Sequence, residues 1–215
     1  MGTRTITLVA AVAFTIVTRG ADLSGQGIAI PPVAPTARPA WVAGDIPDEV
    51  WQRVEASVTA GDEERRQLLS EAEHHARTSL AERPESVDRH FALAVVLGMR
   101  ADREGGRTKI SSASALHDEL SAILEKDPDH TRARYLLGRL HAGVRRMNRV
   151  TRWLATNLLG GATLKQATWV GAEEHLSFAE HFAPEVPDHH LQLARLYEDT
   201  GRPDRARQEL EHVLE

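Results

Sequence analysis

The chain has 215 residues, a formal net charge of −5 and no cysteine. The lack of cysteine excludes disulfide bonds, thiolate metal sites and a cysteine nucleophile, and it is compatible with an oxidising compartment. Apolar residues make up 41% and charged residues 27% of the chain, a composition typical of a soluble globular protein. Because aromatic residues make up only 5%, the core must be built mainly from Leu, Ala and Val.

Residues 1–20 predict a targeting segment. Arg4 precedes an apolar run over residues 6–17. This run is shorter than the roughly 20 residues that a membrane-spanning helix needs, and it fits the central region of a secretory signal peptide. An uncleaved N-terminal anchor and a buried element of the fold remain as alternatives. We therefore expect an exported protein, periplasmic or secreted, or one that residues 1–20 anchor to a membrane.

Residues 21–45 follow as a proline-rich linker, with four prolines between residues 31 and 39. Proline fixes φ and lacks a backbone donor, so this stretch is expected to be a disordered, extended spacer. The folded domain is expected over residues 46–215.

Helical periodicity dominates the chain from Pro47 onwards. A first helix is expected from Pro47 to about Val58, followed by helices over 63–80, 86–103 and 108–126. Gly105 and Gly106 mark a turn between the last two. Each helix is amphipathic and must bury its apolar side against a neighbour.

The C-terminal part has the spacing of a 34-residue tetratricopeptide repeat. The residues that carry this spacing are Leu193, Ala194, Tyr197, Gly201, Ala206, Leu210 and Val213. An upstream repeat starts at Leu137-Gly138 and resumes at Ala172, but it carries 22 extra residues between its two helices. The predicted fold is therefore all-α, a tetratricopeptide-like solenoid of antiparallel helix pairs with an inserted short helix.

The insert is expected to form a helix that ends at Gly160-Gly161, with Thr163 and Gln166 forming the capping box of the next helix. Two faces of the insert helix differ in character. The apolar face is expected to pack against the array and comprises Met147, Val150, Leu154 and Leu158, with Trp153 beside it. The basic face is expected to point outwards and comprises Arg145, Arg149 and Arg152.

Residues 130–172 contain seven arginines, Lys165 and no acidic residue. One interpretation is a solvated basic face that pairs with acidic residues elsewhere. The other is a surface for an anionic partner: an acidic peptide, a lipid phosphate or a polyanion. Nucleic acid is not expected, because few aromatic residues accompany the arginines and the chain is acidic overall.

The first helix of each tetratricopeptide repeat lines a concave groove. By that analogy Arg132, Tyr135, Arg139 and Arg195 are expected in the groove, together with Leu191. The alternative is that they pair with Asp188, Glu198 or Asp199. The candidate partner-binding residues are Arg132, Tyr135, Arg139, Arg145, Arg149, Arg152, Trp153 and Arg195.

No catalytic or metal-binding pattern stands out among the eleven histidines. His74-His75 and His189-His190 are adjacent pairs, whose members point to different sides of a helix and cannot chelate one ion. His141 occupies a packing position of its repeat and is expected in the core. We therefore expect no enzyme activity, no cofactor and no metal.

Several runs resemble the regulator of microtubule dynamics family over about residues 47–215. They are residues 90–98, the run Tyr-Leu-Leu-Gly-Arg-Leu-His at 135–141, the end of the insert at 158–162, and residues 172–184. The chain has Leu140 where the family often has tryptophan. The resemblance implies tetratricopeptide-like repeats and a protein-interaction or tethering role, with microtubule or lipid association in some eukaryotic members. A secretory signal fits microtubules poorly, so only the fold and the binding class are carried over.

The predicted function is a non-enzymatic binding scaffold that captures an anionic protein or peptide through the arginines of its groove and insert helix. The alternative is anionic lipid binding or membrane tethering through the basic insert helix.

Overall fold

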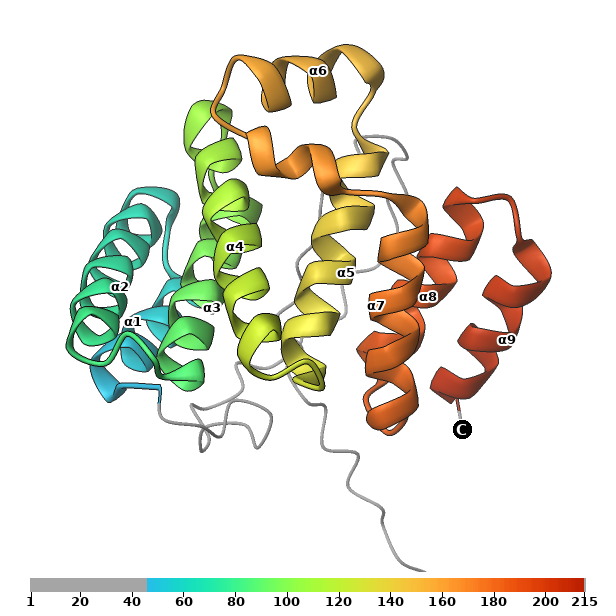
Figure 1. Ribbon diagram of the computed structural model, residues 1–215, viewed down its shortest axis with the longest axis horizontal. Coiled ribbons are helices and arrows are strands. Elements are labelled where there is room, and N and C mark those ends of the chain that lie inside the picture. The colour runs from blue at the N-terminus through green and yellow to red at the C-terminus, as the bar shows by residue number, and fades with distance from the viewer. Residues whose placement is uncertain (1–45, 215) are drawn as a thin grey trace, which may run out of the picture.

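A computed structural model describes residues 46–214 of the chain, and within that range every regular element is a helix. The predictions for residues 1–20 and 21–45 lie outside the described residues. The helices form four antiparallel pairs, α1 with α2, α3 with α4, α5 with α7, and α8 with α9, stacked side by side (Figure 1). The predicted all-α helix-pair solenoid is confirmed.

The helix bounds agree closely with the predicted ones. The elements are α1 (Asp48–Thr59), α2 (Asp62–Glu82), α3 (Val87–Arg103), α4 (Gly106–Lys126), α5 (Thr131–Arg146), α6 (Arg149–Asn157), the 3₁₀ helix η2 (Ala162–Gln166), α7 (Trp169–Phe182), α8 (Pro187–Asp199) and α9 (Pro203–Leu214). Residues 147–168 connect α5 to α7 and contain α6 and η2, which lie across the top of the solenoid in Figure 1. The insertion within the third pair is therefore also confirmed.

Local side-chain chemistry fixes several helix starts. Ser86 accepts a hydrogen bond from the backbone N–H of Arg89 at the start of α3, and Asn148 accepts one from Thr151 at the start of α6. The N-cap of α7 is Thr168, whose Oγ1 accepts from Gly171 N at 2.9 Å. The predicted capping box at Thr163 is wrong. Thr163 lies within η2, and its hydroxyl is bonded to Ser114 Oγ on α4 instead.

The core consists of three apolar clusters along the solenoid. The largest spans α1 to α5, the second joins α5, α7, α8 and α9, and the third lies under the insert. The pair α5 and α7 approaches closely at Gly138, where a Cβ atom would lie 2.8 Å from Leu176 Cγ and 3.1 Å from the carbonyl oxygen of Ala172. A glycine is needed there because any side chain would force the two helices apart.

Candidate binding groove

A cavity of about 490 Å³ lies where α5 meets α3, α4 and α8. Because α3, α5 and α8 are the first helices of their pairs, this is the side on which a solenoid of this kind forms its groove. The lining residues are Ala101, Asp102, Lys109, Ile110, Ala113, Leu116, Leu136, Arg139, Leu140, Gly143, Val144, Arg146, Met147, Gln192, Arg195, Glu198 and Asp199. We call this set the groove.

The floor of the groove is apolar because α5 presents one side of its helix to it. Leu136, Leu140 and Val144 recur at intervals of four residues and lie on one face. Ile110 and Ala113 of α4 face them and are buried. The floor can therefore accept an apolar side chain of a partner.

Arg139 is the most buried cation of the groove. Its side chain is 9% exposed, and its Nη1 atom donates to Tyr135 Oη at 3.1 Å and lies 3.7 Å from Asp188 Oδ2. Burial lowers the pKa of Arg139 to about 9, so it keeps its charge at neutral pH, and the negative charge of Asp102 opposes this shift. Arg139 thus lies between two carboxylates and is held within the fold.

Asp102 of α3 adds a carboxyl group to the lining of the groove. Its side chain is 4% exposed, and burial raises its pKa, against the positive charges of Arg103 and Arg139. Among residues 46–214 its Oδ1 atom has no hydrogen-bond partner. The groove is therefore not uniformly basic.

The rim on α5 and α8 carries exposed and half-buried charges. Arg146 Nε lies 2.6 Å from Asp199 Oδ2, so this cation is already paired. Arg195 is exposed, and Lys109 is half-buried. Neither Arg195 nor Lys109 forms an ion pair with the residues that the structure describes. These two cations are available to an anionic partner.

The structure separates the residues that were predicted for the groove. Arg139 and Arg195 line it, as expected. Tyr135 does not, because its hydroxyl donates to Asp188 and its ring packs against His189, with 4.7 Å between the ring centroids. Arg132 also lies elsewhere, with its guanidinium 4.6 Å from the centre of the Phe91 ring on α3. The alternative of internal pairing therefore holds for Tyr135 and, in part, for Arg139.

The predicted orientation of the insert helix is wrong. Val150, Trp153 and Leu158 are 69%, 57% and 59% exposed, so the apolar face of α6 points outwards. The face that packs on the solenoid carries Ala155 and Thr156, and Leu164 of η2 fills the space beneath. Small residues allow α6 to lie close to the neighbouring backbone, and this decides which side faces in. Met147 does pack inwards, as predicted, where it lines the groove.

The three arginines assigned to the insert have different surroundings. Arg149 is exposed. Arg152 Nη1 donates to the carbonyl oxygens of Arg145 and Met147, at 3.2 and 3.1 Å, and so caps the C-terminal end of α5. Arg145 is half-buried, and its Nε atom is buried without a hydrogen-bond partner in the described part of the chain. Within the described part of the chain, Arg149 is the one of the three that is exposed, as was expected of all three.

Sequence reasoning missed Lys109, Asp102 and Arg146 as groove residues. The four-residue spacing of Leu136, Leu140 and Val144 was a signal that could have located the floor. Lys109 and Asp102 gave no such signal, because their place depends on how the α3–α4 pair docks on α5.

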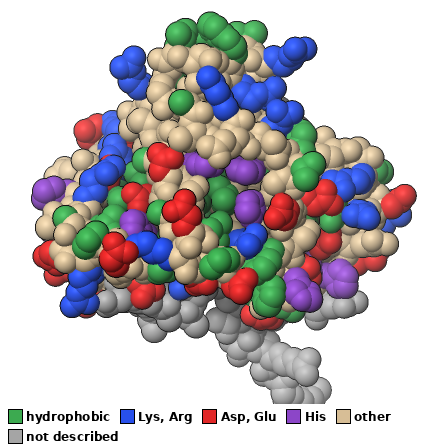
Figure 2. All heavy atoms as spheres, in the orientation of Figure 1, with side chains coloured by type: hydrophobic (Ala, Val, Ile, Leu, Met, Phe, Trp, Pro, Cys, Tyr) green, Lys and Arg blue, Asp and Glu red, His purple; other side chains and the backbone are tan. Residues whose placement is uncertain are grey.

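Three histidine rings lie in contact within the solenoid, one each from α4, α5 and α7; His117 and His141 are stacked, and His175 meets His141 edge-on. The ring of His141 lies 5.9 Å from that of His117 and 5.6 Å from that of His175. His141 is 7% exposed, which confirms its expected place in the core, and neither of its ring nitrogens has a hydrogen-bond partner within residues 46–214. Figure 2 shows histidine side chains gathered just below the insert. In the same residue range no group of three or more His, Asp or Glu side chains is arranged to hold a metal ion.

Comparison with protein families gives a match over residues 50–215, which contain the helix pairs except for the first two residues of α1, together with the insert and the groove. The matching family is described as regulator of microtubule dynamics protein 1-3. The chain belongs to this family. A search of curated proteins found no match. Membership in the regulator of microtubule dynamics family identifies the chain as a regulator-type helical protein, and the resemblance inferred from residues 90–98, 135–141 and 172–184 is confirmed.

Proposed function

We propose that this family member is a non-enzymatic scaffold that captures an anionic protein or peptide in the groove between α3, α4, α5 and α8. The observation that carries the proposal is the pair of cations, Lys109 and Arg195, which line a cavity with an apolar floor and form no ion pair within residues 46–214. A partner segment with acidic and apolar residues would place a carboxylate against these cations and an apolar side chain on Leu136 and Leu140. Membership in a regulator family supports a binding role of this general kind.

In this proposal fewer residues contact the partner than the sequence predicted. Arg195 and Lys109 would meet the partner, whereas Arg139 would support the groove from within, and Arg132 and Tyr135 lie outside it. The family description names microtubule dynamics. Only the binding class is carried over, because residues 1–20 predict export.

Reversing the groove charges is expected to weaken capture of acidic peptides by at least ~10-fold, since two close charge pairs are together worth over ~1.4 kcal/mol. The measurement is fluorescence anisotropy of labelled peptides rich in Asp, Glu and Leu, with full-length wild type and the Lys109→Glu/Arg195→Glu variant. Affinity should also fall as salt is raised.

The matched control is Arg205→Glu/Arg207→Glu on α9, two exposed arginines outside the groove. It should bind like wild type. Peptides in which every acidic residue is replaced by lysine should not bind. Equal affinity for both peptide sets, or an unchanged affinity of the groove variant, would contradict the proposal.

We propose further that the chain is exported, or that residues 1–20 anchor it to a membrane. The apolar run at 6–17 supports this. N-terminal sequencing of the protein recovered from fractionated cells is expected to show cleavage close to residue 20. An intact chain in the membrane pellet would instead indicate an anchor, and an intact chain in the cytosol would contradict both forms.

A further inference from the structure

The outward face of α6 carries a concentrated group of exposed apolar side chains. Eight large apolar residues are exposed in the described part of the chain, and four of them belong to α6 and its C-cap. We call these four the apolar ridge; it consists of Val150, Trp153, Leu154 and Leu158. In Figure 2 the ridge is the apolar patch at the top of the molecule. A group of this kind on a soluble domain marks a surface that is covered by something else.

The opposite face of α6 holds the ridge in this orientation. Ala155 and Thr156 are buried against the solenoid, and Arg152 is bonded to two carbonyl oxygens at the end of α5. Leu158 N continues the helical hydrogen bonding by donating to Leu154 O at 2.9 Å. The ridge is therefore exposed because the opposite face of α6 packs against the solenoid.

The surroundings of the ridge are cationic. Residues 130–172, which include all of α6 and η2, contain no acidic residue. Arg149 on α6 and Lys165 on η2 are exposed, and Figure 2 shows basic side chains on both flanks of the apolar patch. An occupant of the ridge must therefore combine an apolar interior with negative charge at its surface.

We propose that the apolar ridge docks this protein on an anionic membrane surface. Trp153 and its apolar neighbours would enter the boundary between headgroups and acyl chains, while Arg149 and Lys165 would contact lipid phosphates. Tryptophan suits that boundary because its ring is apolar and its indole N–H is polar. The helix lies on the bilayer, since none of the helices in residues 46–214 is long and apolar enough to cross one.

Two features favour a membrane over other occupants. The ridge lies on α6, which projects from the top edge of the solenoid in Figure 1, where a fluid surface can adapt to the side chains. A second copy of the chain, joined ridge to ridge, would bring two sets of cations together, and neither α6 nor η2 has an acidic residue to neutralise them. The proposal is independent of the groove, because the ridge residues do not line it.

The test measures how the full-length chain partitions onto vesicles of phosphatidylcholine, with or without an equal share of phosphatidylglycerol. The ridge variant is Val150→Ser/Trp153→Ser/Leu158→Ser, at three exposed positions where little effect on folding is expected. We expect wild type to bind the anionic vesicles more tightly, and the ridge variant to bind them at least ~10-fold less tightly, given the apolar area removed from insertion. High salt should also weaken wild-type binding.

The matched control is Val58→Ser/Phe182→Ser, which removes apolar side chains that are 49% and 59% exposed on α1 and α7. It should bind as wild type does. In a second measurement brominated lipids should quench tryptophan fluorescence in wild type, and Trp153→Phe should remove most of that quenching. This readout separates insertion of α6 from any contact made by residues 1–20, which all the variants share.

Equal vesicle binding by wild type and the ridge variant overturns the proposal, as does quenching that Trp153→Phe leaves unchanged. A concentration-dependent dimer that the ridge variant abolishes, measured by light scattering, would identify a second copy as the occupant and would also overturn it. If the ridge variant lost vesicle binding but bound peptides as wild type does, membrane docking through the ridge would be supported and the groove proposal would be unaffected.

Discussion

Acidification from pH 6.5 to about 4 is expected to lower the free energy of unfolding by about 3 kcal/mol through His141 alone. Burial lowers the pKa of His141 to about 4, and the charges of His175 and His117 add to this shift. Above pH 6.5 the ring is neutral in both states, so stability does not depend on it. Between pH 6.5 and 4, His141 binds a proton in the unfolded chain but stays mostly neutral in the folded chain. The free energy of unfolding therefore falls as the pH falls.

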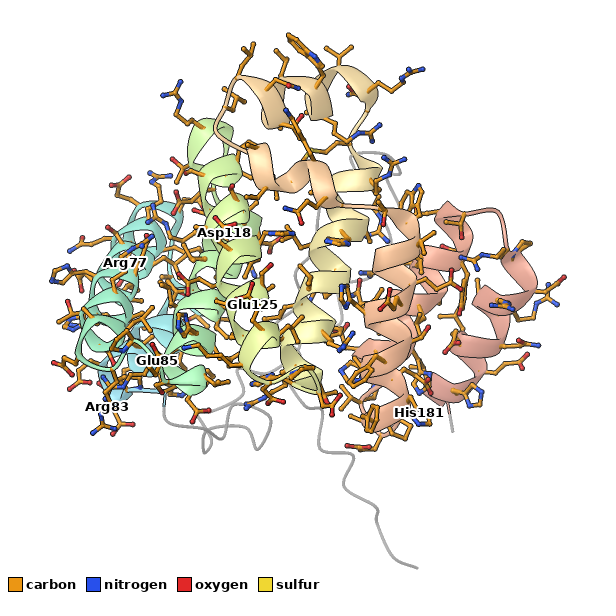
Figure 3. All side chains as sticks on the ribbon, viewed as in Figure 1. Arg77, Arg83, Glu85, Asp118, Glu125 and His181 are labelled. Atoms are coloured by element: carbon orange, nitrogen blue, oxygen red, sulfur yellow. The ribbon has the colours of Figure 1, made fainter. Side chains whose placement is uncertain are left out.

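The measurement is urea unfolding followed by circular dichroism between pH 4 and 8. His141→Leu, of similar volume and with no polar atoms, should remove about 3 kcal/mol of that dependence and be no less stable than wild type at pH 7. His181→Leu is the control, because this histidine of α7 is exposed and points away from the helix stack in Figure 3. A pH dependence that His141→Leu leaves unchanged would show that the buried His141 ring does not control acid unfolding.

The repeat pattern allowed most of the fold to be predicted from sequence. The spacing from Leu193 to Ala206 gave the α8–α9 pair, and the longer step from Leu137 to Ala172 gave the insertion between α5 and α7. These predictions hold because each helix is amphipathic and each turn is marked by glycine or proline. The periodicity is a local property that tertiary contacts reinforce.

The orientation of side chains on α6 could not be predicted in the same way. Two faces of α6 could pack against the solenoid, one with small residues and one with large apolar residues. The face with Ala155 and Thr156 packs inwards. The choice depends on the space left by α4 and η2, which the sequence of α6 does not contain. The same limit applies to Arg152, whose partners are carbonyl oxygens at the end of another helix.

The sequence predicted the location of Arg139 correctly but not its structural role. The groove analogy placed it correctly on the inner side of α5, and it lines the cavity. The sequence could not show that its side chain would be 9% exposed, since that depends on Asp188 and Asp102 arriving from α8 and α3. A basic residue at a groove position can thus be a support for the fold, and substitution can tell the two roles apart.

Arg139→Ala is expected to lower the free energy of unfolding by ~3–5 kcal/mol at pH 7, because it leaves the buried Asp188 without the cation 3.7 Å away and removes one of the cations near Asp102. Burial raises the pKa of both Asp188 and Asp102. The positive charge of Arg139 opposes this shift for Asp102 and lies 3.7 Å from Asp188, so removing it should raise both pKa values further. The folded variant would then take up protons more readily than its unfolded chain. Its deficit relative to wild type should therefore shrink as the pH falls from 7 towards 5, which urea titrations at both pH values can measure.

Arg207→Ala on α9 provides the control, since that side chain is 70% exposed and should cost less than ~0.5 kcal/mol. Combining Arg139→Ala with Asp188→Asn should recover part of the loss, because the amide needs no counter-charge. If Arg139→Ala were as stable as the control but bound acidic peptides more weakly, Arg139 would be a contact residue of the groove. If stability falls and the double variant recovers it, Arg139 holds α5 and α8 together, and recognition depends on Lys109 and Arg195 at the rim.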